Sequence, residues 1–155
     1  MRLAILADSH LPDCSDSAQE ATLRWAVAAA RAAGADWLVA AGDMTAAGEP
    51  VPAERVAAIL AAGGVPYVST PGNAELRDLV VGYSVCRMLT TENAAAPVVT
   101  VDTAMGSVPE TERQRVEQRL ASGSAASVLV THWPPDELPE GDREWFAGLV
   151  ARFSP

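Results

Sequence analysis

Two side chains that bind metals follow directly on the first apolar stretch of the chain. Asp8 and His10, separated by one serine, come after the uninterrupted apolar run Leu3–Ala7. Such a run is typical of a strand buried on both faces of a parallel sheet, and α/β sheets bind ligands at the carboxyl ends of their strands. Because residues i and i+2 share a side of an extended chain, the carboxylate and the imidazole can bind one cation.

Three more polar residues, Asp43, Asn73 and His132, each follow a predicted strand in the same way, and both histidines of the chain stand at such positions. Neighbouring strands lie about 4.8 Å apart, so side chains at the ends of adjacent strands can surround a small cluster of cations. Carboxylate, amide oxygen and imidazole suit Mn, Fe or Zn better than a soft metal. The pattern therefore predicts a site for divalent cations at one edge of a sheet.

Alternating strands and helices have to position these residues. Besides Leu3–Ala7, the apolar runs predict four strands, at Asp36–Ala41, Val65–Ser69, Val98–Val101 and Ser127–Thr131. Capping residues and helical spacing predict helices from Ser17 to Gly34, Pro52 to Gly63, Glu75 to about Cys86, Ser107 to Gly123, and Arg143 to Phe153. Strands joined by helical crossovers run parallel, so we expect an α/β fold in a single domain, residues 1–155.

The composition restricts the class of protein. The net charge is −9, and all eleven basic residues are arginine, which excludes a phosphate-loop lysine and a Schiff-base lysine. An acidic chain is also unsuited to non-specific binding of nucleic acid or membrane, which needs a basic surface. No apolar stretch is long enough to cross a bilayer, and no signal peptide is recognisable. We expect a cytoplasmic protein in which Cys14 and Cys86 are free thiols.

The chain resembles the calcineurin-like metallophosphoesterases in an ordered set of four motifs: Asp8-x-His10, Gly42-Asp43, Gly72-Asn73-x-Glu75, and His132 before Pro134-Pro135. The strand end at Asp102 further resembles the phosphodiesterase branch of that family. The resemblance covers Met1 to about Pro135. It implies a metallophosphoesterase-like sandwich of mixed sheets flanked by helices, with two bound divalent metal ions.

The resemblance also implies a role for each motif residue. Asp8 and His10 would bind the first metal ion, Asp43 would bridge both ions, and Asn73 and His132 would bind the second. A hydroxide bridging the metals would attack phosphorus in line, with Asp43, Asn73 and His132 as the catalytic set. Two metal ions about 3.5–4 Å apart lower the pKa of bound water and neutralise charge developing on phosphate. We expect a small phosphomonoester or phosphodiester as substrate.

The sequence departs from the family pattern at two points. Ala74 stands where the family usually has a histidine, and a missing general acid typically costs about 10²–10⁴-fold in rate. The closing Gly-His-x-His of the family, which adds a ligand to each metal, has no counterpart. We therefore expect the fold to be incomplete at its C-terminus, through truncation or divergence. An incomplete sheet exposes an apolar edge, through which a homodimer could form.

Other interpretations stay open. The departures favour a second hypothesis, a catalytically impaired or non-catalytic remnant of the fold that serves as a binding or interaction module. Gly72-Asn73 could be a simple turn and His132 a packing residue. Glu75 fits a helix cap better than a metal ligand, Arg77 fits a solvated residue, and Asp102 fits a structural one. A phosphate-accepting receiver domain needs a lysine, and a dinucleotide-binding domain needs Gly-x-Gly-x-x-Gly; the chain has neither.

Overall fold

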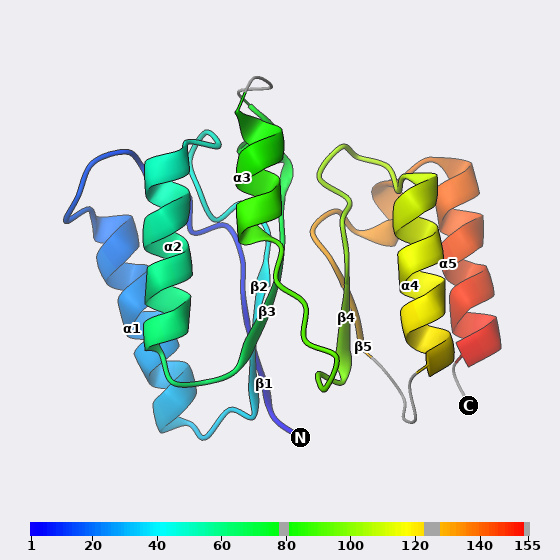
Figure 1. Cartoon of the computed structure of the whole chain (residues 1–155), viewed down its shortest axis with the longest axis horizontal. Coiled ribbons are helices and arrows are strands. Elements are labelled where there is room, and N and C mark those ends of the chain that lie inside the picture. The colour runs from blue at the N-terminus through cyan, green and yellow to red at the C-terminus, as the bar shows by residue number, and fades with distance from the viewer. Residues whose placement is uncertain (78–80, 123–127, 154–155) are drawn as a thin grey trace.

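Two parallel sheets lie face to face at the centre of the computed structural model, which describes residues 1–77, 81–122 and 128–153 (Figure 1). The first sheet contains β1 (Leu3–Leu6), β2 (Trp37–Ala41) and β3 (Tyr67–Thr70) in the order β1-β2-β3. The second contains β4 (Val98–Val101) and β5 (Val128–Thr131). All ladders between these strands are parallel, and Ser69 and Thr91 add one isolated antiparallel bridge.

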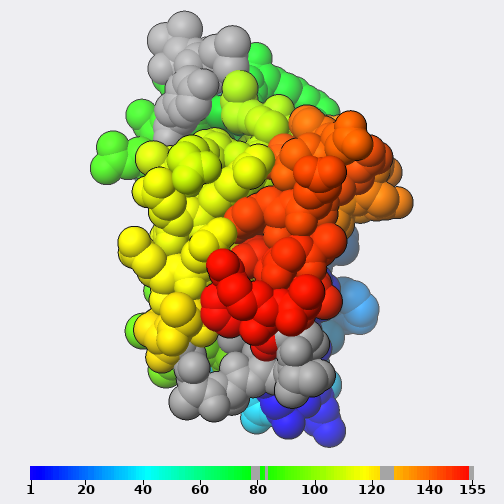
Figure 2. Space-filling view, turned by 90° about the vertical axis from the view of Figure 1, so that its right-hand side faces the viewer, coloured from blue at the N-terminus to red at the C-terminus, as the bar shows by residue number. Residues whose placement is uncertain are grey.

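Helices cover the outer face of each sheet (Figure 1). On the first sheet lie α1 (Ala18–Ala32) and α2 (Pro50–Ala62), and α3 (Gly82–Leu89) packs against α2 and β3. On the second lie α4 (Glu110–Ser122) and α5 (Glu140–Phe153), side by side (Figure 2). Two short 3₁₀ turns, η1 (Asn73–Leu76) and η2 (Pro135–Glu137), follow β3 and β5. The five helices of the described residues, packed around parallel-stranded sheets, confirm the predicted α/β fold class.

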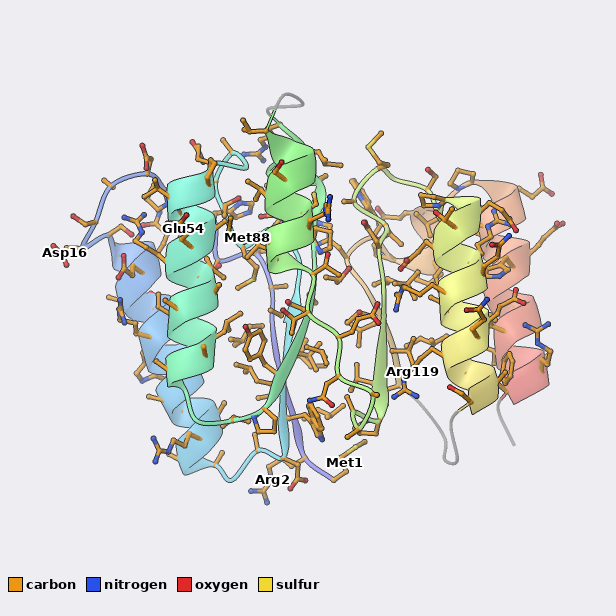
Figure 3. The ribbon with its side chains drawn as sticks, viewed as in Figure 1. Met1, Arg2, Asp16, Glu54, Met88 and Arg119 are labelled. Atoms are coloured by element: carbon orange, nitrogen blue, oxygen red, sulfur yellow. The ribbon has the colours of Figure 1, made fainter. Side chains whose placement is uncertain are left out.

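Strand β2 shows how the apolar runs build the layers. Leu38 and Ala40 face α1 and α2, whereas Val39 and Ala41 face the second sheet and pack near Val130. Both faces of β2 are buried because successive side chains of a strand point to opposite faces and each face has a covering layer. Polar side chains such as Arg2, Asp16 and Glu54 lie at the periphery (Figure 3).

Strand β1 differs from its prediction. It pairs with β2 only, so it forms an edge of the first sheet as far as the structure describes the chain. Ile5 is 59% exposed, and Leu3, Ala4 and Leu6 are only partly buried. The expectation of a strand buried on both faces is therefore wrong, because an apolar run does not reveal which strand lies at the edge.

Four helices differ from their predicted bounds in the described residues. Helix α4, expected from Ser107, begins at Glu110. The helix predicted from Glu75 to Cys86 is instead the 3₁₀ turn η1 followed by α3, since the Glu75 side chain turns back onto the Gly72 N–H and closes a short turn. Helix α2 begins at Pro50, because proline is tolerated in the first turn. Helix α5 begins at Glu140, where acidic residues suit a helix N-terminus. The predicted boundaries at 123 and 127 lie outside the described residues.

The two cysteines are free, as predicted: Cys14 is exposed and Cys86 is buried. Burial, with the nearby carboxylates of Asp102 and Glu75, raises the pKa of the Cys86 thiol to about 12, so this side chain stays protonated at neutral pH. Within the described ranges, no helix has the length and apolarity to cross a membrane.

Candidate metal centre

The predicted ligands lie where β1, β2, β3 and β5 end, in loops that pair with one another. The loop after β1 continues to run beside the loop after β2. The Asp8 N–H donates to the Gly42 carbonyl (3.1 Å), and the His10 N–H donates to the Asp43 carbonyl (3.0 Å). These two hydrogen bonds hold Asp8 and His10 next to Asp43, although more than thirty residues separate them in the chain.

Backbone strain is concentrated at these same residues. Asp8, His10 and Asp43 have φ values of 57°, 44° and 52°, and they are three of the four non-glycine residues with positive φ in the described chain. The left-handed region costs a non-glycine residue on the order of 1–3 kcal/mol and occurs preferentially at functional sites. The strain is retained here because the paired loops hold the backbone in place.

The five predicted side chains converge. The two oxygens of Asp43 face different histidines: Oδ1 lies 3.4 Å from His132 Nε2, and Oδ2 lies 3.7 Å from His10 Nε2. His10 Nε2 is also 3.8 Å from Asp8 Oδ1, and His132 Nε2 is 3.1 Å from Asn73 Oδ1. One ligand atom each of Asp8, Asp43 and His132 lies within 4.8 Å of the others. This spacing suits a cation bound between them.

The hydrogen bond of His132 sets which of its nitrogens is free to bind. Nδ1 lies 3.0 Å from the carbonyl oxygen of Ala41, which can only accept, so Nδ1 carries the proton of the neutral ring. Nε2 then presents a lone pair to Asn73 Oδ1 and Asp43 Oδ1, which are acceptors as well. With the ring in this neutral form, three atoms with lone pairs face one another, and a shared metal ion fits this donor set.

The charges around the candidate centre also favour a bound cation. Asp43 is only 5% exposed, and a buried carboxylate is costly unless it is paired or binds a metal. In the described part of the chain, no arginine nitrogen lies within 4.0 Å of the carboxylates of Asp8, Asp43 or Glu75. A bound divalent cation would supply the missing positive charge.

Two glycines allow the loops to approach this closely. A Cβ atom on Gly42 would lie 2.6 Å from His132 Nδ1. A Cβ atom on Gly72 would overlap the Asp43 carboxylate and lie 2.5 Å from the Asp43 nitrogen. Gly72 has φ −117°, so it is needed for space and not for an unusual backbone angle. The Gly-Asn pair is therefore more than a turn, since its glycine lets Asp43 and His132 approach.

The other residues that the sequence analysis considered make structural contacts. Ala74 is fully buried, and its N–H donates to Asp43 Oδ1 (2.7 Å). Glu75 caps η1, as predicted, and Arg77 is exposed and donates to the Ala46 carbonyl. Asp102 accepts from the Ala104 N–H, and burial raises the pKa of its carboxyl group.

The sequence interpretation missed the residues that tie the loops together. Thr45, fully buried, donates its N–H and hydroxyl to Glu75, whose side chain is equally buried. The sequence did contain a signal of this role: Glu75 directly follows Gly72-Asn73-Ala74, and it has no basic neighbour in sequence before Arg77 to pair with it. Its partners lie about thirty residues away, which periodicity does not reveal.

Comparison with known protein families gives a match over almost the whole chain. The family described as calcineurin-like phosphoesterase matches residues 1–152, a span that includes all five converging side chains. A search of curated proteins gives no match.

Proposed function

Because the chain belongs to the calcineurin-like phosphoesterase family, we propose that it hydrolyses small phosphomonoesters or phosphodiesters with two bound divalent metal ions. One observation carries the proposal. The lone pairs of His132 Nε2, Asn73 Oδ1 and Asp43 Oδ1 converge, and no arginine among the described residues balances the carboxylates.

The ligand set divides into two halves joined by Asp43. Asp8 and His10 would hold one metal ion, and Asn73 and His132 would hold the other. Support for a bridging Asp43 comes from its two oxygens, each of which faces a different histidine. Mn, Fe and Zn all suit these ligand types.

When bound, the metal ions would lower the pKa of coordinated water and neutralise charge on the phosphate. The protein residues orient the metal ligands and leave the substrate a side from which to approach. The Ala41 carbonyl holds the His132 ring in the orientation that presents Nε2. The Asp8 and His10 side chains are 61% and 37% exposed, so the substrate phosphate would approach from their side.

The chain offers no proton donor at the position next to the ligand Asn73. Ala74 has no titratable group, and its N–H is already donated to Asp43. A leaving group must therefore depart without protonation from this position, so we expect turnover to favour activated esters such as aryl phosphates over alkyl phosphates.

Ala74 also supports a second candidate function. A domain that retains the ligands but lacks a general acid could bind metal ions and an anionic partner without turning it over. This module would have the same metal affinity as the enzyme and no hydrolytic activity, which makes the two functions separable by experiment.

The test is to purify the protein without chelator, measure its metal content by mass spectrometry, and assay bis(4-nitrophenyl) phosphate and 4-nitrophenyl phosphate. Two metal ions per chain and turnover that EDTA abolishes are the expected results. Metal without turnover would support the binding module. A folded wild-type protein that takes up no Mn²⁺, Fe²⁺ or Zn²⁺ and shows no turnover would contradict the enzyme and the metal-binding module, and would leave a non-catalytic remnant of the fold that binds no metal.

A further inference from the structure

Glu75 carries a completely buried carboxylate that accepts four hydrogen bonds. Oε2 accepts from the N–H groups of Asp43 (3.1 Å) and Gly72 (2.8 Å). Oε1 accepts from the N–H (2.8 Å) and the hydroxyl (2.9 Å) of Thr45. A carboxylate is an acceptor only and has about four lone-pair positions, so this one is saturated by donors.

These bonds join the two loops that carry Asp43 and Asn73. The loop after β2 contains Asp43 and Thr45, and the loop after β3 contains Gly72 and Asn73. Asp43 is held twice by the second loop: its backbone N–H binds Glu75, and its side-chain Oδ1 accepts from the Ala74 N–H. The loop after β3 therefore fixes both the left-handed backbone of Asp43, φ 52°, and its carboxylate.

A helix cap accounts for only one of the four bonds. The bond from the Gly72 N–H closes η1, whereas those from Asp43 and Thr45 reach across 32 and 30 residues of chain. Two glycines also pack against the Glu75 backbone. A Cβ atom on Gly48 would overlap the Glu75 carbonyl group, and one on Gly82 would lie 2.6 Å from its oxygen. The position is thus enclosed by several segments.

We propose that Glu75 is a positioning residue of the metal centre, which holds Asp43 and Asn73 at the separation that metal binding requires. The inference rests on the proposed function, because it assigns Glu75 a role through Asp43 and not as a ligand. Loss of a residue that orients metal ligands typically weakens metal binding about 10–100-fold.

The main test compares Mn²⁺ affinity, by titration calorimetry, of the wild-type protein and Glu75→Gln. The amide group of glutamine turns an NH₂ toward N–H donors in place of one acceptor oxygen. We expect Glu75→Gln to bind Mn²⁺ about 10–100-fold more weakly while remaining folded. Its hydrolysis of an aryl phosphodiester should fall at low Mn²⁺ and recover in part at saturating Mn²⁺, which loss of a catalytic group would not allow.

Asp142→Asn is the matched control. Asp142 is 3% exposed and accepts from the Val108 N–H and from Arg113, at the second sheet and its helices. This variant should melt at a lower temperature in EDTA and bind Mn²⁺ as the wild type does. Wild-type Mn²⁺ affinity in Glu75→Gln would overturn the proposal, whatever the change in melting temperature.

Thr45 provides a second pair of variants, which keeps the proposal testable if Glu75→Gln does not fold. Thr45→Val removes one hydrogen bond to Glu75 and should weaken Mn²⁺ binding about 2–10-fold, and Thr45→Ser should restore it. Equal affinity in Thr45→Val and Thr45→Ser would overturn the role of Glu75. Failure of the wild-type protein itself to bind Mn²⁺, Fe²⁺ or Zn²⁺ would overturn the proposed function, and the positioning role with it.

Discussion

The candidate metal centre has a buried half and an exposed half. The side chains of Asp43 and His132 are 7% and 11% exposed, whereas those of Asp8 and His10 are 61% and 37% exposed. The buried pair is held by hydrogen bonds from the Ala74 N–H to Asp43 and from His132 to the Ala41 carbonyl. In the described structure, the side chains of the exposed pair make only the longer 3.7–3.8 Å contacts.

This difference in exposure suggests that one pair of side chains governs metal affinity and the other governs access of the substrate. Side chains already fixed by hydrogen bonds lose little conformational entropy when they bind a metal ion, whereas exposed side chains have to be ordered first. We infer that the buried half sets the metal affinity and that the exposed half admits the phosphate ester. Substitutions at Asp43, Gly72 and the two histidines test this division, and one at Asp102, with the smallest expected effect, tests a residue outside it.

Asp43→Asn should abolish metal-dependent hydrolysis and weaken metal binding by more than the roughly 10–100-fold expected for a supporting residue. The substitution removes the charge that both histidines face. Metal content and phosphodiesterase activity are the measurements, with Asp8→Asn as the comparison in the exposed half. Wild-type-like activity in Asp43→Asn would contradict the bridging role.

Gly72→Ala should lower both stability and metal affinity, because its Cβ atom would overlap the Asp43 carboxylate. Overpacking of this kind costs about 1–3 kcal/mol. Gly148→Ala in α5 is the control: nothing lies within 4 Å of its added Cβ, so it should stabilise the helix by about 0.5–1 kcal/mol. Chemical denaturation measures both, and a neutral Gly72→Ala would argue against close loop contact.

His132→Ala should weaken metal binding more than His10→Ala, although each should abolish hydrolysis. His132 is fixed by the Ala41 carbonyl before metal binds, and His10 is not held by any comparable side-chain bond among the described residues. Calorimetric titration with Mn²⁺ compares the two variants. Equal losses of affinity would show that burial does not divide the centre in the way inferred here.

Asp102→Asn should leave metal affinity unchanged and raise stability at neutral pH, because the amide has no charge to bury. Burial, then the charge of Glu112, raises the pKa of the Asp102 carboxyl group in the folded state. The folded protein therefore holds this proton more tightly than the unfolded chain, so the wild type loses stability as pH rises from the unfolded pKa through the folded one. Denaturation curves of both proteins across that pH range test this direction. A stability difference between the two proteins that does not change with pH would contradict it.

Much of the centre could be predicted because parallel strands end at a common edge. The rule predicts that the polar residues after the apolar runs converge, and the structure brings all five together. The distribution of burial could not be predicted in this way. The apolar run of β1 suggested a buried strand, yet Ile5 is exposed because strand order, which local sequence does not encode, places β1 at the edge.

The sequence by itself determined which residue types stand at the strand ends, because apolar runs and turn residues act over a few neighbours in the chain. Only the tertiary structure decided that Glu75 joins two loops, that His132 presents Nε2, and that Asp43 is buried while Asp8 is not. Those properties depend on contacts between segments 30 to 91 residues apart, and such contacts exist only once the layers have packed.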